Sequence, residues 1–240
     1  MPGLGTIINV AAIIAGGLAG ILFGNKLKEH FRETLIHGIG VATLFLGAGG
    51  VMRQMLVLKD GTLETQGTMM LIVCLALGAV CGEALQIEEH IEQFGEWLKK
   101  KTGNAKDAGF VHAFLTASLT VCIGAMAVVG SVEDGIRFDP SILEAKAILD
   151  FIIVMVMAAS MGKGCLFSFV PVGIFQGTIT LLAFFIGTGV SPEALNRISY
   201  VGNALIFCVG TNLVWGRRIR VGNLLPSLIF AILWGLLPLG

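Results

Sequence analysis

Charged residues are scarce in this chain of 240 amino acids. Only 13% of the residues are charged, whereas 55% are hydrophobic and the mean hydropathy is +0.86. A soluble domain carries about a quarter charged residues. A chain with so little charge cannot cover its folded form with a wetted surface. The composition therefore excludes an ordinary soluble protein and predicts an integral membrane protein.

The sequence also lacks the motifs of soluble enzymes and of nucleotide-driven pumps. It contains no Gly-x-Ser-x-Gly, no Walker loop and no His-Glu-x-x-His. The five cysteines lie in apolar runs without the paired spacing of zinc or iron–sulfur sites. The formal net charge of zero gives no overall field that would attract nucleic acid. We therefore expect no enzyme activity, no cofactor or metal, and no nucleic-acid partner.

Long apolar runs fill most of the chain. The first, from Leu4 to Gly24, has no Lys or Arg before it, so it lacks the basic segment of a cleaved signal peptide and is expected to be retained. Because a helix needs about 20 residues to cross the hydrocarbon core, the sequence predicts an all-α polytopic protein with about eight transmembrane helices in one domain, residues 1–240. The predicted spans are roughly 4–24, 36–57, 69–87, 109–132, 147–163, 166–189, 199–216 and 223–239.

The distribution of basic residues predicts how the chain is threaded. Lys and Arg are enriched in cytoplasmic connections. With the N-terminus outside, eleven basic residues fall in cytoplasmic connections and five fall outside, which are Arg53, Lys59, Arg137, Lys146 and Arg197. The expected location is a bacterial inner membrane, with both termini outside.

Two connections have the pattern of amphipathic helices. Apolar residues recur at helical spacing near 25–35, around Phe31, and near 86–101, around Trp97. Such helices can lie in the membrane interface with their apolar side in lipid. Equally, each can pack on the cytoplasmic face of the protein, where it could also bind a partner.

The chain contains a weak internal repeat. The segment 122–130 matches 208–216 at an offset of 86 residues, and the same offset aligns Pro140-Ser141 with Pro226-Ser227. The two copies are three spans apart. Because three is an odd number and successive spans alternate in direction, the repeat-like units near 109–163 and 199–240 would have opposite orientations in the membrane. Inverted repeats are typical of secondary transporters, which hold substrate near the midplane. A chance match between Gly-rich apolar strings is the alternative.

Polar residues at membrane depth are the candidate functional residues, because burying them costs free energy. The candidates for a substrate or ion pathway are Gln176, Asn203, Asn212, Thr211, Asp150 and Glu83, and those for an outer mouth are Glu133 and Asp134. All of them except Asp150 have a structural alternative. The amides can join helices through hydrogen bonds, Glu83 can reach headgroup water, and the Glu133-Asp134 pair can belong to a solvated turn.

Four strings resemble a known family. They are Gly3-x-Gly5-Thr6-x-x-Asn9, the stretch from Cys122 to Gly135, Phe175-Gln176-Gly177 and Gly210-Thr211-Asn212-Leu213. They are similar to the bacterial multi-pass membrane proteins grouped as domain of unknown function 554, and the likeness covers essentially the whole chain. It implies a cytoplasmic-membrane protein with a role in transport, but it carries over no catalytic or ligand residues.

The favoured function is therefore a secondary transporter or channel for a small polar solute or ion. With 33 glycines offering close-packing surfaces, we also expect a homodimer in the bilayer. The alternative is a non-transporting scaffold or sensor that binds partners through its cytoplasmic helices. An intramembrane enzyme acting on lipid is least favoured, since no nucleophile with a nearby base is visible.

Overall fold

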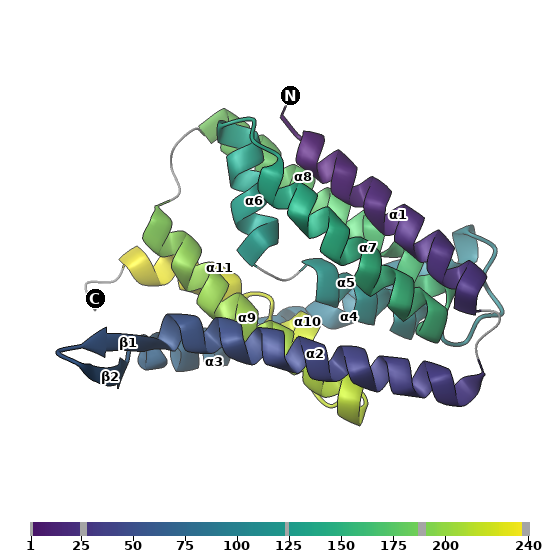
Figure 1. Cartoon of the computed structure of the whole chain (residues 1–240), viewed down its shortest axis with the longest axis horizontal. Helices are drawn as coiled ribbons and strands as arrows, with labels where there is room; N and C mark the ends of the chain where they lie inside the picture. The colour runs from purple at the N-terminus through teal and green to yellow at the C-terminus, as the bar shows by residue number, and fades with distance from the viewer. Residues whose placement is uncertain (1, 25–27, 123–124, 187–190, 237–240) are drawn as a thin grey trace. The chain divides into compact units, whose positions relative to one another are not determined.

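Helices make up nearly all of the described chain. The computed structural model describes residues 2–24, 28–122, 125–186 and 191–236. Its helices, drawn in Figure 1, are α1 (Leu4–Gly24), α2 (Glu29–Met55), α3 (Thr68–Leu85), α4 (Ile87–Lys101), α5 (Phe110–Cys122), α6 (Ala125–Ile136), α7 (Ser141–Met161), α8 (Phe169–Ile186), α9 (Pro192–Trp215), α10 (Val221–Leu224) and α11 (Ser227–Leu233), with 3₁₀ turns η1 (Lys163–Ser168) and η2 (Trp234–Leu236). The predicted all-α class is confirmed.

The described residues hold five helices long and apolar enough to cross a membrane, or six if the bent pair of α5 and α6 forms one span. The predicted number of eight is not confirmed. Helix α7 carries three charged residues within its 21, which leaves it too polar to count by composition. Within the predicted span 223–239, the described residues up to 236 are divided among α10, α11 and η2, and residues 237–239 lie outside the described part of the chain. Helix α7 ends at Met161, near the boundary between the predicted spans 147–163 and 166–189, and Gly162 there has a φ of +97°.

Two local features differ from the sequence-based expectation. Residues 29–35, whose pattern predicted an interfacial helix, are continuous with the long helix α2. A β-hairpin also follows α2, with β1 (Leu56–Lys59) paired antiparallel to β2 (Thr62–Thr65). Its turn is Asp60-Gly61, and both residues have positive φ. Asp-Gly is a favoured pair for such a turn, because Gly takes positive φ without a steric cost.

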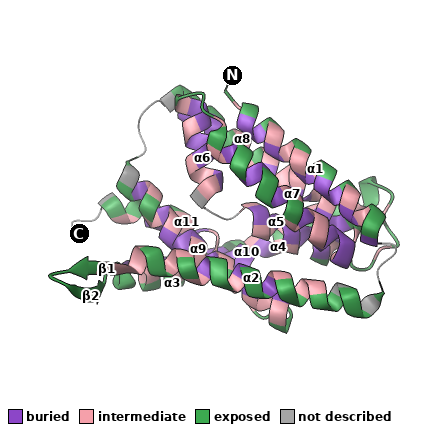
Figure 2. Cartoon of the chain, viewed as in Figure 1, coloured by how far each residue is buried: buried purple, intermediate pink, exposed green. Residues whose placement is uncertain are grey.

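The chain folds into two compact units. The first comprises Met1–Ile39, His90–Cys122 and Met126–Gly189, and the second comprises Gly40–Glu89, Ile123–Ala125 and Val190–Gly240. In the first unit, α1 lies along α7 (Figure 1), with α8 and η1 also against α1. Buried residues recur along α1 at steps of one to four (Figure 2).

Glycines bring α1 onto the backbone of α7. A Cβ at Gly16, Gly20 or Gly24 would lie 2.4, 2.1 and 2.6 Å from the carbonyl oxygens of Phe151, Met155 and Ala159, respectively. No larger residue fits such distances without moving a helix. The numbering rises together on both helices, so α1 and α7 run parallel. Small residues that allow close approach are a general means of packing helices in lipid.

The first unit also contains most of the amphipathic helix α4. Its apolar side chains Phe94 and Leu98 pack on Phe110 and Phe114 of α5. Trp97 lies beside them, about half exposed. This face of α4 therefore packs on protein, as the second of the two alternatives for this segment supposed.

The second unit has an apolar core. Met70 and Cys74 of α3 pack there with Tyr200 and Val201 of α9 and Ala231 of α11. Glycines again permit close packing. A Cβ at Gly78 would lie 2.6 Å from the Ser227 backbone nitrogen, and one at Gly82 would lie 1.7 Å from the Asn223 carbonyl oxygen. The numbering runs in opposite directions here, so α3 meets this segment antiparallel.

The internal repeat corresponds to similar local structure at one of its two aligned stretches. Pro140 and Pro226 each stand immediately before a helix, α7 and α11. At the other stretch, residues 125–130 lie inside α6, whereas the aligned residues 211–216 run past the end of α9. Residues 123 and 124 lie outside the described part of the chain. The inverted repeat thus stays a prediction.

Candidate functional site

A lysine and an aspartate form a buried ion pair inside the first unit. Lys146 and Asp150 lie one turn apart on α7 and are 6% and 3% exposed. The Lys146 Nζ donates a hydrogen bond to a carboxylate oxygen of Asp150 and another, of 2.8 Å, to the Val121 carbonyl oxygen at the end of α5. Taking both charges out of water costs several kcal/mol per ion. The pair therefore calls for a functional explanation.

Two amides extend this pair across the unit. The Nδ2 of Asn9, on α1, donates to Asp150 Oδ2 at 3.0 Å and to Gln176 Oε1, on α8, at 3.2 Å. Asn9 and Gln176 are both fully buried. Residues from α1, α7 and α8 thus meet, with α5 contributing a carbonyl. We call Asn9, Lys146, Asp150 and Gln176 the polar cluster.

The polar cluster has unused hydrogen-bonding capacity. Asn9 Oδ1 and Gln176 Nε2 have no hydrogen-bond partner among the described residues, and neither does the Oγ1 of Thr180, one turn further along α8. Leaving a buried polar group unpaired costs about 1–3 kcal/mol. One acceptor and one amide donor in adjacent side chains can together bind a polar solute or a water molecule.

A second buried carboxylate lies at the N-terminal end of α1. Asp134, on α6, is fully buried, and its Oδ2 accepts a hydrogen bond of 3.1 Å from the backbone N–H of Gly5. The first N–H groups of a helix have no partner inside it and favour negative charge, so Asp134 caps α1 from another helix. Its Oδ1 has no partner among the described residues. Asp134 is therefore part of helix α6 and not of a solvated turn.

One buried polar residue of α1, Thr6, lies between this carboxylate and the polar cluster. Thr6, 7% exposed, lies between Gly5 and Asn9 on the buried face. Asn9 lies five residues into α1, roughly 8 Å along its axis at 1.5 Å per residue. The polar groups thus extend from the N-terminal end of α1 into the helix packing. Glu133, beside Asp134, instead pairs with Arg137 at 3.1 Å, where the arginine is largely exposed.

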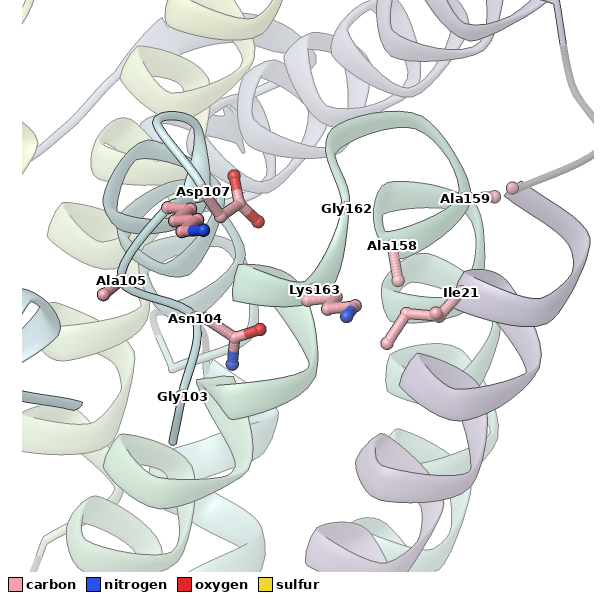
Figure 3. A pocket seen from close by; sticks show the side chains of 11 residues that line it. Ile21, Gly103, Asn104, Ala105, Asp107, Ala158, Ala159, Gly162 and Lys163 are labelled. Carbon is pink, nitrogen blue, oxygen red and sulfur yellow. The ribbon is translucent and has the colours of Figure 1, made fainter. Parts of the chain in front are cut away.

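A cavity lies at the opposite end of α1 and α7 (Figure 3). It measures about 580 Å³ and is lined by Ile21, Gly24, Ala158, Ala159, Gly162, Lys163 and residues 103–107. In Figure 3 the Lys163 side chain lies between Asn104, on the loop before α5, and Ile21, on α1. Ile21 is twelve residues from Asn9, roughly 18 Å along the helix. The cavity is therefore separate from the polar cluster.

Other predicted site residues are in the second unit, where Asn203 and Thr211 donate to their own helix and Glu83 forms a surface ion pair with the segment before α10. Asn203 donates to the Ser199 carbonyl oxygen one turn away, at 2.7 Å. Thr211 donates to the Phe207 carbonyl oxygen in the same way. Glu83 pairs with Arg220 at 3.3 Å, with both side chains more than half exposed. Each of these residues serves its own helix or its surface.

Asn212 organises the loop after α9. Its Oδ1 accepts hydrogen bonds of 2.9 Å from the N–H groups of Arg218 and Ile219, and its Nδ2 donates to the Ile219 carbonyl oxygen at 2.7 Å. These bonds use both acceptor positions of the amide oxygen and one N–H of the amide nitrogen in a turn. Asn212 and Gln176, considered together from the sequence, belong to different units.

Three residues with buried polar contacts were missed from the sequence. Asn9 lies near the start of the first apolar run, and Lys146 was expected in an outside connection, but α7 begins at Ser141 and carries it into the packing. Glu88 was expected on the polar face of α4, yet it is 3% exposed, pairs with Arg217 and accepts from the Gly222 N–H at 2.7 Å. The spacing of Lys146 and Asp150 could have indicated their ion pair, because residues four apart lie one turn apart on the same face of a helix.

The comparisons with known proteins agree with this architecture. A family model described as "Protein of unknown function (DUF554)" matches residues 4–236. The chain belongs to the DUF554 family. Across 225 residues it is 27% identical to the uncharacterized membrane protein YdfK of Bacillus subtilis (strain 168), covering 94% of this chain and 92% of YdfK. Across 236 residues it is 27% identical to the uncharacterized protein YqgA of Escherichia coli (strain K12), covering 95% and 94%.

No solved structure matches the chain. The family match and the relative from B. subtilis place this DUF554 chain among membrane proteins. They confirm the resemblance that the sequence strings indicated.

Proposed function

We propose that this DUF554 chain is a secondary transporter or channel for a small polar solute or ion. One observation carries the proposal: a charged pair is buried between helices and joined to two amides that keep unpaired hydrogen-bonding atoms. Ionisable groups at membrane depth are usual in substrate and proton pathways, where they pair with one another. A purely structural cluster would be expected to satisfy its own polar atoms.

The buried charges also suggest how transport is coupled. Asp150 and Asp134 are the carboxylates in the buried part of the first unit that could take up a proton or a sodium ion. In the proposed mechanism the solute binds Asn9 and Gln176, and the ion alters the Lys146–Asp150 pair. The proposal includes a homodimer in a bacterial inner membrane, both termini outside, and two inverted repeats moving against one another.

The test is the thermal stability of the purified protein in detergent, with a panel of ions, amino acids, sugars and carboxylates. A ligand that binds the folded state raises its apparent stability by mass action. We expect one class of solute to stabilise the wild type and to lose this effect in Asn9→Leu and Gln176→Met. Asn212→Ala is the control, because its amide serves a loop in the other unit, and it should keep the ligand effect.

A solute found in this way is then offered to proteoliposomes. Transport predicts uptake by the wild type and none by Gln176→Met. If no solute stabilises the wild type while the cluster variants are only less stable, the cluster is structural. The scaffold function, with α4 as part of a partner surface, would then be preferred.

A further inference from the structure

The second unit contains a polar cavity of its own. It measures about 430 Å³ and lies where the ends of α2 and β2 meet the starts of α3 and α9 and the turn η2. Its lining residues are Gln54, Gln66, Gly67, Met70, Glu193, Asn196, Arg197, Tyr200, Trp234 and Gly235. The volume falls within the range of small-molecule sites, about 300–1,000 Å³. None of these residues belongs to the polar cluster.

A buried hydroxyl without a partner marks this cavity as a binding site. Tyr200, the only tyrosine of the chain, is 3% exposed, and its hydroxyl has no hydrogen-bond partner among the described residues. The Nε of Arg197, one turn earlier on α9, is also buried and has no hydrogen-bond partner among the described residues. Buried Tyr hydroxyl groups usually find a partner. Two unpaired donors beside one cavity indicate a ligand that accepts hydrogen bonds.

The guanidinium of Arg197 lies against the backbone at residue 235. A Cβ at residue 235 would lie 2.2 Å from the Nη2 of Arg197, so Gly235 lets the arginine approach the backbone of this segment. A planar guanidinium presents donors in the geometry that matches a carboxylate. The site therefore carries a positive charge on the same helix as Tyr200.

The remaining lining residues define the kind of anion. Met70 and Trp234 supply apolar wall, and both belong to the apolar core of the second unit or pack against it. Asn196 and Gln54 add amide groups. Glu193 is the single carboxylate of the lining; it is exposed in the first turn of α9, where the helix dipole favours negative charge. An organic anion suits this mixture better than inorganic phosphate.

We propose that this cavity binds a small organic carboxylate. The carboxylate accepts hydrogen bonds from Arg197 and Tyr200, and the carbon part of the molecule lies against Met70 and Trp234. The site is distinct from the solute site proposed in the first unit and does not depend on it.

Tryptophan fluorescence provides a local test. Of the three tryptophans, Trp97 is on α4 and Trp215 ends α9, so a Trp97→Phe and Trp215→Phe background leaves Trp234 as the only reporter. Butyrate and succinate are titrated in detergent, with butyramide and succinamide as uncharged counterparts. We expect saturable fluorescence changes with the carboxylates and none with the amides.

Four variants in this background, two at the site and two controls, identify the residues that bind. We expect Arg197→Gln to weaken carboxylate binding by about 10-fold or more, and Tyr200→Phe by about 5-fold, as for lost hydrogen bonds to a charged group. Arg53→Gln, an exposed position in the last turn of α2 outside the lining, should bind as before. Gln176→Met should also leave the signal unchanged, which separates this site from the proposed transport site.

Several results would overturn the proposal. They are the absence of any saturable change, equal responses to the amides, or unweakened binding by both Arg197→Gln and Tyr200→Phe. Because Tyr200→Phe keeps the shape of the ring, it preserves the packing in the core. A melting curve of each variant without ligand confirms that loss of binding is not loss of fold.

Discussion

The two units place their predicted pathway residues differently. The first buries a lysine, two aspartates and two amides among packed helices. The second keeps an apolar core, and its predicted pathway residues Asn212 and Glu83 serve a loop and an exposed ion pair. Both units use glycines to bring helices together, so close packing alone does not explain the difference. Glu88 and Asn223 of the second unit are buried as well, so the first unit is distinguished by an ion pair whose two partners are both buried.

The second unit also has an ion pair, and it shows what a structural pair looks like. Glu88 is buried, but Arg217 is 42% exposed, and the second carboxylate oxygen of Glu88 accepts from the Gly222 N–H. This pair joins the start of α4 to the segment before α10 at a helix end. Lys146 and Asp150, by contrast, are both buried. The contrast supports a functional role for the pair in the first unit.

Breaking the two ion pairs should have unequal effects. Lys146→Met leaves Asp150 as an unpaired buried charge, so we expect it to lower the free energy of unfolding by about 3–5 kcal/mol. Arg217→Met removes a partly exposed partner and leaves Glu88 its backbone bond, so a loss of about 1 kcal/mol is expected. Denaturant unfolding in detergent measures both. Equal losses would contradict the contrast between the units.

A double variant sharpens the first result. Lys146→Met with Asp150→Leu removes both charges, and we expect it to recover most of the stability lost by Lys146→Met, because replacing a buried pair by apolar residues is often neutral. If the pair is functional, the double variant should nonetheless lose the solute effect on melting temperature. Recovery of both stability and solute effect would assign the pair a structural role only.

Glycine substitutions test the close helix packing that is found within each unit. Gly20→Ala places a Cβ 2.1 Å from the Met155 carbonyl oxygen, so we expect a loss of about 1–3 kcal/mol from overpacking. Gly49→Ala, in α2, is the matched control, since nothing lies within 4 Å of its Cβ position. There alanine should stabilise by about 0.5–1 kcal/mol through its helix propensity. Thermal unfolding should therefore shift in opposite directions.

Asn212 tests whether the amides of the second unit are structural. Asn212→Ala removes an acceptor used by two N–H groups and a donor to one carbonyl, and we expect a loss of about 1–3 kcal/mol. Asn212→Asp keeps the acceptor and should lose less. Denaturation curves compare them. A change in solute effect without a change in stability would instead assign Asn212 to the pathway.

The fold class and most helix positions could be predicted because apolar runs are long and glycines mark breaks. The span at α7 was predicted to begin at residue 147, since Lys146 suggested an outside loop, whereas the helix begins at Ser141. A charged residue normally marks the end of a membrane span. Only the contacts of Lys146 with Asp150 and with the Val121 carbonyl oxygen show why Lys146 lies inside helix α7. The number of spans was also overestimated near the C-terminal end, where short helices lie between Val221 and Leu236 in place of one long span.

The site was predicted in part. Gln176, Asp150 and Asp134 were chosen from the sequence because polar groups at membrane depth are costly, and the structure places all three, buried, in the first unit. Asn203, Asn212, Thr211 and Glu83 were chosen by the same rule but lie in the second. Depth along a run gives no information on which face of a helix a residue occupies or which helix it meets. Asn9 was missed because it lies close to the start of its run.

The smallest expected effect concerns a carboxylate at the surface of the first unit. Asp139 accepts hydrogen bonds from the Ser141 hydroxyl and then the Ser141 backbone N–H, and these bonds lower its pKa below the usual value. A carboxyl with a lowered folded-state pKa contributes stability above its unfolded pKa and loses it as the pH falls through the folded pKa. Asp139→Asn should therefore be slightly less stable than wild type at pH 7, with the difference shrinking on acidification below about pH 4. Melting temperatures across this range measure it. Because Asp139 is exposed, a difference as large as that of Lys146→Met would show that this connection, and not the buried pair, dominates the stability of the first unit.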